Sequence, residues 1–246
     1  MKFLRSGRVR VLLIALLMLP LAAVADDTRR PGKAGIASAH QLATEAGMEI
    51  LRQGGNAFDA AVAVSAALAV VEPSSSGLGG GGFWLLHRAS DGFETMVDAR
   101  EVAPGAATHD MFLDPQGNVA KGRSTSTALA AAIPGEPAGF EHISKTYGKL
   151  PFKTVLQPAI RLAREGFPLN ERLRGGIVAK RETFNAGAAA KIFLTKGEVP
   201  AVGTVIKQPE LAKTLTTLAE QGDECIGIAP NISAIPTLCR FPSSSC

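Results

Sequence analysis

Cysteine is nearly missing from this 246-residue chain, and its three copies all fall in the last 22 residues, as Cys225, Cys239 and Cys246. No disulfide can therefore form within the first 224 residues. If the chain is exported, one pair of the terminal cysteines could oxidise and leave the third over. Their spacing matches no zinc pattern, so we expect no metal site there.

Sequence signatures of the common catalytic and cofactor sites are also missing. There is no G-x-S-x-G elbow, Walker loop, Rossmann fingerprint or H-E-x-x-H motif. The glycine run at residues 77–82 is followed by a strand pattern and by no Lys-Ser/Thr pair, which argues against nucleotide binding. We expect no cofactor, and no metal at the four histidines, whose spacing is not that of metal ligands: His40, His87, His109 and His142.

The chain beyond residue 25 has no excess of positive or negative side chains. The formal net charge is +4, and residues 1–25 hold four basic and no acidic side chains: Lys2, Arg5, Arg8 and Arg10. With an apolar run at 11–21 and Ala23-Val24-Ala25 before Asp26, this segment is typical of a secretory signal peptide. We therefore expect a periplasmic or secreted protein that is near neutral after cleavage, with neither nucleic acid nor membrane as a partner.

The remaining chain, with 46% hydrophobic residues overall, predicts a layered α/β fold. We expect a domain at 26–222 and a divergent Cys-, Pro- and Ser-rich tail without helical or strand period at 223–246. Asn56 is the expected N-cap of a buried helix. Expected helices lie at 40–53, 57–71, 136–147, 152–165 with a kink or restart at Pro158, 169–180 and 208–221, and a short helical turn begins at 110. Expected buried strands lie at 34–39, 83–86 and 128–135, and 93–98 returns as a hairpin strand through a turn at 90–92.

The stretch at 74–101 contains the segment whose expected backbone conformation is the most unusual in this chain. Five of the six residues from Gly77 to Gly82 are glycine, which permits positive φ and close approach of a ligand or a neighbouring chain. Arg100 leaves the end of the predicted hairpin, where its planar fork of donors could bind a carboxylate or phosphate. The alternative is a surface arginine paired with Glu101. The hydroxyl groups of the exposed polar loop at 121–127 are expected to be inert.

Several ordered motifs together resemble the gamma-glutamyltransferase family. They are His40-Gln41-Leu42-Ala43, the segments 54–61, 76–83 and 98–101 with Pro104, Ile133-Pro134-Gly135, and 158–163 with Gly166-Phe167. The resemblance implies an N-terminal nucleophile hydrolase, an αββα sandwich made as a precursor that cleaves itself into a large and a small subunit. It implies that Arg100 binds the α-carboxylate of a γ-glutamyl substrate such as glutathione, with the glycine run as close-packed core beside it.

The resemblance covers only the first part of the large subunit. The family's nucleophile lies in a Thr-Thr-His motif at the start of the small subunit, and neither Thr108-His109 nor Thr216-Thr217 has that context. We therefore expect no catalytic residue in this chain, an incomplete sandwich, and a chain that is inert without the small subunit. The tail suggests a frameshift or an interrupted reading frame, and the alternative is a genuine tail of different sequence. Alternative functions are a fragment of a glutaryl or cephalosporin acylase, and a non-catalytic periplasmic γ-glutamyl-binding protein.

Overall fold

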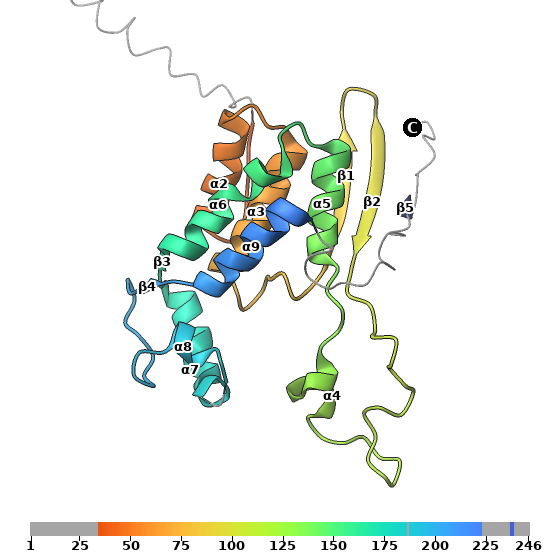
Figure 1. Ribbon diagram of the computed structural model, residues 1–246, viewed down its shortest axis with the longest axis vertical. Helices are drawn as coiled ribbons and strands as arrows, with labels where there is room; N and C mark the ends of the chain where they lie inside the picture. The colour runs from red at the N-terminus through yellow and green to blue at the C-terminus, as the bar shows by residue number, and fades with distance from the viewer. Residues whose placement is uncertain (1–33, 186, 223–236, 239–246) are drawn as a thin grey trace, which may run out of the picture. The chain divides into compact units, whose positions relative to one another are not determined.

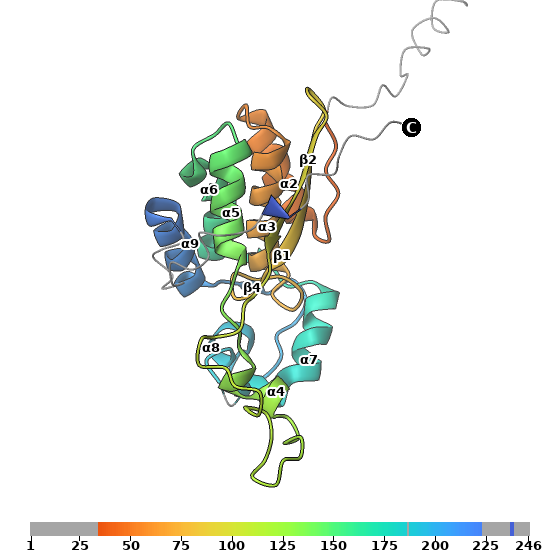
Figure 2. The ribbon, with the colours of Figure 1, turned by 90° about the vertical axis from the view of Figure 1, so that its right-hand side faces the viewer.

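The computed structural model describes residues 34–185, 187–222 and 237–238. Every helix and strand named below belongs to the compact unit that begins at Ile36, which is considered by itself. A layer of helices in this unit packs against a β-hairpin (Figures 1 and 2). The predicted signal peptide at 1–25 lies outside the described residues.

Helix α3, Ala57–Val71, is the centre of the helical layer. It packs against α2 (Gln41–Arg52), α5 (Glu136–Tyr147) and α6 (Phe152–Glu165), and its Ala- and Val-rich sequence is buried on most faces, as predicted. Alanines allow these neighbours to approach closely. Helix α9, Pro209–Gln221, continues the layer by packing on α6.

The N-terminus of α3 is held by a capping box. The side chain of Asn56 accepts hydrogen bonds from the backbone N–H groups of Phe58 and Asp59, and the Asp59 carboxylate accepts from the backbone N–H of Asn56. The same two side chains reach the α5–α6 connection, where Asn56 Nδ2 donates to the carbonyl of Tyr147 at 2.7 Å and Asp59 Oδ2 accepts from the N–H of Lys149 at 2.9 Å. The predicted cap is therefore confirmed, and it joins two distant parts of the chain.

The hairpin consists of β1, Gly82–Arg88, and β2, Phe93–Ala99, in antiparallel register with Trp84 opposite Val97. The predicted turn is confirmed, with Gly92 at φ +68°. One face packs against the helices: Trp84 meets the ring of Phe140 on α5 edge to face. The expectation of a buried strand at 83–86 is wrong for the other face, where Phe83 is 58% and Leu85 76% exposed, because no described element covers it.

A second group of elements follows α6, which runs without a break through Pro158, so no restart occurs there. Strand β3, Phe167–Pro168, pairs with β4, Val205–Ile206, and neither strand was predicted. Helix α7, Glu171–Asn185, begins two residues later and ends five residues later than expected, and α8, Ala190–Phe193, follows it. The strong helical spacing of apolar residues at 208–221 allowed α9 to be predicted. A strand of two residues is too short to show any hydrophobic period, so β3 and β4 could not be predicted.

Two predicted strands are absent from the described residues. Residues 34–39 carry no strand pairing. Residues 128–135 form the exposed turn η2, Ala128–Ala130, and then pair only through an isolated bridge between Ile133 and Val102. Small apolar residues suit a strand only if a neighbouring backbone is available to pair with them.

Three further local predictions need correction. The expected helical turn at 110 is a run of hydrogen-bonded turns, although the polar turn at 114–117 forms as predicted. The loop at 121–127 contains a short helix, α4, Arg123–Ser126. Within the tail, β5, Thr237–Leu238, pairs with Met96 and Val97 of β2, so the tail is not free of strand structure. Its other residues lie outside the described ranges.

Within the described ranges, no helix has the length and apolarity needed to cross a membrane. The same ranges contain no group of three or more His, Cys, Asp or Glu side chains arranged to hold a metal ion.

Candidate functional site

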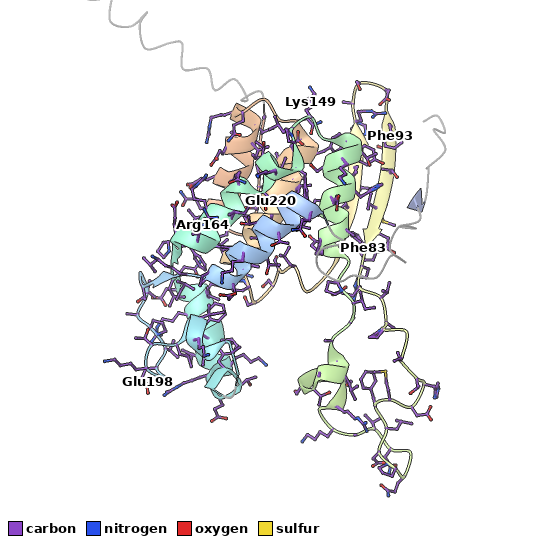
Figure 3. The ribbon with its side chains drawn as sticks, in the orientation of Figure 1. Phe83, Phe93, Lys149, Arg164, Glu198 and Glu220 are labelled. Atoms are coloured by element: carbon purple, nitrogen blue, oxygen red, sulfur yellow. The ribbon has the colours of Figure 1, made fainter. Side chains whose placement is uncertain are left out.

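Arg100 follows the last residue of β2 and turns the chain away from the hairpin. Its backbone N–H donates to Oδ1 of Asp98 at 3.0 Å, which fixes the direction in which the chain leaves the strand. In Figure 3, Phe83 marks this end of the hairpin and Phe93 the opposite one. The guanidinium is exposed, at 63% of the side chain, and its Nε donates to Oε2 of Glu101 at 2.9 Å. The described residues thus place Arg100 at the surface and in the ion pair that the sequence offered as the alternative.

Two glycines hold the backbone of Ala99 and Arg100 between them. A Cβ on Gly81 would lie 2.8 Å from the Cα of Arg100, and a Cβ on Gly135 would lie 2.5 Å from the carbonyl oxygen of Arg100. Both would be closer still to the carbonyl oxygen of Ala99. A side chain at either position would force the backbone apart, since real Cβ atoms do not approach so closely. We call this arrangement the glycine clamp.

The clamp is closed by backbone hydrogen bonds. The N–H groups of Gly135 and Glu136 both donate to the carbonyl of Gly80 at 3.1 Å, and Val102 and Ile133 exchange a pair of bonds just beyond. Three motifs that lie far apart in the sequence, the glycine run, residues 98–101 and residues 133–135, therefore meet at Arg100. This proximity explains their residue types better than positive φ does, because no glycine from 77 to 82 has positive φ.

The glycine run is not uniform. Gly79 is exposed and a Cβ there would meet nothing within 4 Å, whereas Gly81 is in close contact with Arg100. The expectation of close-packed core therefore holds for Gly81 and not for Gly79. Within the run, glycine is required where the backbone packs closely against another segment, as at Gly81, and not where the position is open, as at Gly79.

Two carboxyl groups beside the clamp differ in their electrostatics. The pKa of Glu101 is lowered, first by its own backbone N–H and then by the Arg100 guanidinium. The pKa of Glu136 is raised because burial penalises its charged form and the charge of Glu101 adds to that penalty, although the Ser65 hydroxyl and Trp84 favour the charged form. Glu136 is 8% exposed, and its Oε1 accepts from Ser65 Oγ at 2.8 Å.

Sequence reasoning did not single out Glu136. It is an acidic residue in the first turn of a helix, a common position on any solvent-exposed helix. Only the packing of α5 on α3 and β1 shows that the carboxyl group is buried. The one available signal was its place directly after Ile133-Pro134-Gly135.

The other candidate groups have ordinary structural partners. His40 caps α2, His87 contacts Glu94, and His109, whose side chain is 97% exposed, contacts Asp110. Thr216 and Thr217 lie on α9 and donate to backbone carbonyls one turn earlier. Two hydroxyl-bearing residues of the loop at 121–127, Thr125 and Ser126, line a cavity of about 590 Å³ next to α7 and α8, and Arg100 is not in its lining.

The arrangement of helices on a hairpin is shared with solved enzymes. The gamma-glutamyltranspeptidase of Helicobacter pylori superposes with a TM-score of 0.75 at 41% identity, over 78% of this chain and 56% of that one. The cephalosporin acylase of Bacillus halodurans superposes with a TM-score of 0.65 at 28% identity, over 80% and 40% of the two chains. The fold is thus part of the N-terminal nucleophile hydrolase fold, as the sequence predicted.

The sequence comparison is more specific. The family model described as gamma-glutamyltranspeptidase matches residues 43–226, and the glutathione hydrolase proenzyme of Escherichia coli K12 is 42% identical over 206 residues. The chain belongs to the gamma-glutamyltranspeptidase family. That match covers 82% of this chain and 35% of the relative, so the chain spans about a third of the length of this curated relative.

Proposed function

We propose that this chain supplies the donor-carboxylate site of an enzyme that transfers or hydrolyses γ-glutamyl groups, with glutathione and related γ-glutamyl amides as substrates. The observation that carries the proposal is the glycine clamp, which gives one arginine a fixed backbone at the end of a strand. A planar guanidinium held in this way can form two parallel hydrogen bonds to an α-carboxylate. The substrate carboxylate would take over from Glu101, whose ion pair is exposed and weak.

The attacking hydroxyl belongs, in this proposal, to a small subunit of the same precursor. No Thr-Thr-His motif occurs in the 246 residues, and the hydroxyl groups named above have structural partners. The names of relatives as glutathione hydrolase proenzymes support a partner subunit released by processing. We also propose export to the periplasm or the medium, supported by the charged and apolar pattern of residues 1–25, with Asp26 as the N-terminus expected from Edman sequencing.

The test replaces the matching segment of the Escherichia coli proenzyme with residues 34–221 of this chain. In this chimera, Arg100→Ala should raise the KM for a γ-glutamyl anilide roughly 10- to 100-fold, because one or two charge-assisted hydrogen bonds are lost. Arg100→Lys should recover only part of the loss, since an ammonium group cannot form the planar pair.

Arg88→Ala is the matched control. Arg88 lies at the other end of the same hairpin, is 44% exposed, and pairs with Asp91 as Arg100 pairs with Glu101. Its substitution should leave KM within about twofold, as expected for an exposed ion pair. An equal effect of the two substitutions would show that Arg100 does not bind the donor.

A second candidate is hydrolysis of glutaryl or cephalosporin side chains, which the likeness to a cephalosporin acylase supports. Glutaryl amides lack the α-amine of a γ-glutamyl donor. Turnover of glutaryl anilide by the chimera at a rate above that of γ-glutamyl anilide would favour this candidate.

A further inference from the structure

Glu136 combines burial with incomplete hydrogen bonding. Only 8% of the residue is exposed, and Oε1 accepts from Ser65 on α3. Oε2 is buried and makes no hydrogen bond of ordinary geometry within the described residues, although the Trp84 side chain lies near enough to favour the charged form. Burying a carboxyl group costs free energy unless its oxygens are paired, and one hydrogen bond does not fully offset the desolvation. The side chain also closes the space over Gly82, where an added Cβ would lie 3.2 Å from Oε2.

The backbone of Glu136 is attached directly to the glycine clamp. Its N–H and that of Gly135 share the carbonyl of Gly80, and Gly135 packs on the carbonyl of Arg100. A shift at the start of α5 would therefore be passed to the backbone of Arg100 through rigid contacts. The hydrogen bond from Ser65 is the contact that ties the Glu136 side chain to α3.

The polar groups around the Glu136 carboxyl group come from three elements. Ser65 approaches from α3, Trp84 from β1, and Glu101 from the segment after β2. Burial and the Glu101 charge raise the pKa of Glu136, so the surroundings favour its neutral form. A neutral acid can still accept the Ser65 hydrogen bond, as can the isosteric amide of glutamine.

We propose that Glu136 is a positioning residue for Arg100: its bond to Ser65 ties the start of α5 to α3 and thereby sets the backbone on which the guanidinium is carried. This inference rests on the proposed function. Small displacements of a substrate-binding group cause large losses in donor binding, so the contribution of Glu136 appears in the affinity for the donor rather than in the chemical step.

The experiment uses the chimera described above and compares Glu136→Ala, Glu136→Gln and Ser65→Ala. Glu136→Ala and Ser65→Ala should each raise the KM for γ-glutamyl anilide about tenfold with kcat within about threefold, the size expected for loss of one buried hydrogen bond. Glu136→Gln should keep KM within about threefold. In the double variant with Arg100→Ala, Glu136→Ala should add nothing, because it acts through that arginine.

Glu141→Ala is the matched control, since Glu141 lies on the same helix and has the same 8% exposure. It should destabilise the protein without raising the donor KM. Hydrogen exchange on the full 246-residue chain gives a second measurement: Glu136→Ala should speed exchange at 99–103 and 131–137, while exchange in α2 stays unchanged.

The outcomes separate the two proposals. If Arg100→Ala raises KM and Glu136→Ala does not, the positioning role is wrong and the proposed function stands. If Arg100→Ala has no effect, the proposed function fails. Equal effects of Glu136→Ala and Glu141→Ala, or additive effects of Glu136→Ala and Arg100→Ala, would also overturn the positioning role.

Discussion

Arg100 and Glu136 show how two ionisable residues joined through the backbone of the glycine clamp can have opposite surroundings. The guanidinium keeps most of its side-chain surface in water, so it can exchange Glu101 for another partner. The carboxyl group of Glu136 is enclosed by α3, α5 and β1 and is driven towards its neutral form. The exposure of Arg100 could be predicted from local sequence, because residues 98–101 end a hairpin. The burial of Glu136 could not, because it depends on how distant elements pack.

Glu136 should make the stability of this chain fall with rising pH. Its pKa is raised in the folded state, so between its ordinary value and the raised value the folded chain binds more protons than the unfolded chain. The stabilisation that the protonated Glu136 carboxyl group provides is fully present below its ordinary pKa, and it is lost as the pH rises through the raised pKa of the folded state. Glu136→Gln should therefore leave Tm nearly unchanged in acid and raise it at neutral pH, measured by thermal melts across pH.

A difference in Tm between Glu136→Gln and the wild type that is constant across pH would contradict this expectation. Glu141→Gln serves as the control on the same helix. Glu101 contributes the opposite sign, because its pKa is lowered and its stabilisation is lost as pH falls. Because Glu101 is present in both proteins, its contribution cancels when the Tm of Glu136→Gln is compared with that of the wild type at the same pH.

At the scale of elements, the helices were predictable and the short strands were not. Asn56 before an apolar run, and Gly148 and Gly166 after two others, gave helix boundaries within a residue or two. The segment 128–135 has strand-like composition, yet pairing depends on a partner, and only Ile133 finds one in Val102. The glycine clamp was not predictable, because the glycine run alone gave no information on which glycine faces Arg100.

The clamp predicts different tolerances for two glycines in one loop. Gly81→Ala should destabilise the chain by about 1–3 kcal/mol, or more if the hairpin end cannot shift, because the added methyl group overlaps the backbone of Ala99 and Arg100. Gly79→Ala meets nothing within 4 Å and should stay within roughly 1 kcal/mol of the wild type or be slightly stabilising. Urea denaturation measures both values. Equal losses would mean that the loop is held by something other than the clamp.

At the scale of the whole compact unit, the helices cover one face of the β1–β2 hairpin and leave its apolar outer face exposed. Phe83 and Leu85 lie on the strand face opposite to Trp84, which packs on α5, and both are more than half exposed. On its far side, β2 pairs with β5. An αββα sandwich could be inferred from the resemblance alone. Of that sandwich, the described residues show one helical layer and the sheet that contains the hairpin. The exposed face could not be read from the sequence, because the unbroken apolar run at 83–86 predicted a buried strand.

This face should make the isolated chain associate. Leu85→Lys should reduce the rise of apparent mass with concentration in sedimentation velocity, because a charge interrupts the exposed apolar strand. Val119→Lys is matched in exposure, 77% against 76% for Leu85, but lies in a loop away from the hairpin and should leave association unchanged. If both substitutions act alike, net charge rather than the hairpin face controls association.

The cap of α3 has a consequence for the order in which a growing polypeptide acquires structure. Asn56 and Asp59 bind backbone groups about 90 positions downstream, and the buried Gln208 side chain donates to the carbonyl of Val70, 138 positions earlier. At synthesis rates of roughly 5–20 residues per second, about 7 to 28 seconds separate translation of Val70 on α3 from that of Gln208. During that interval the most apolar helix of the described chain must be shielded from other nascent chains, so delays placed between codons 71 and 208 should lower the soluble yield more than delays after codon 222.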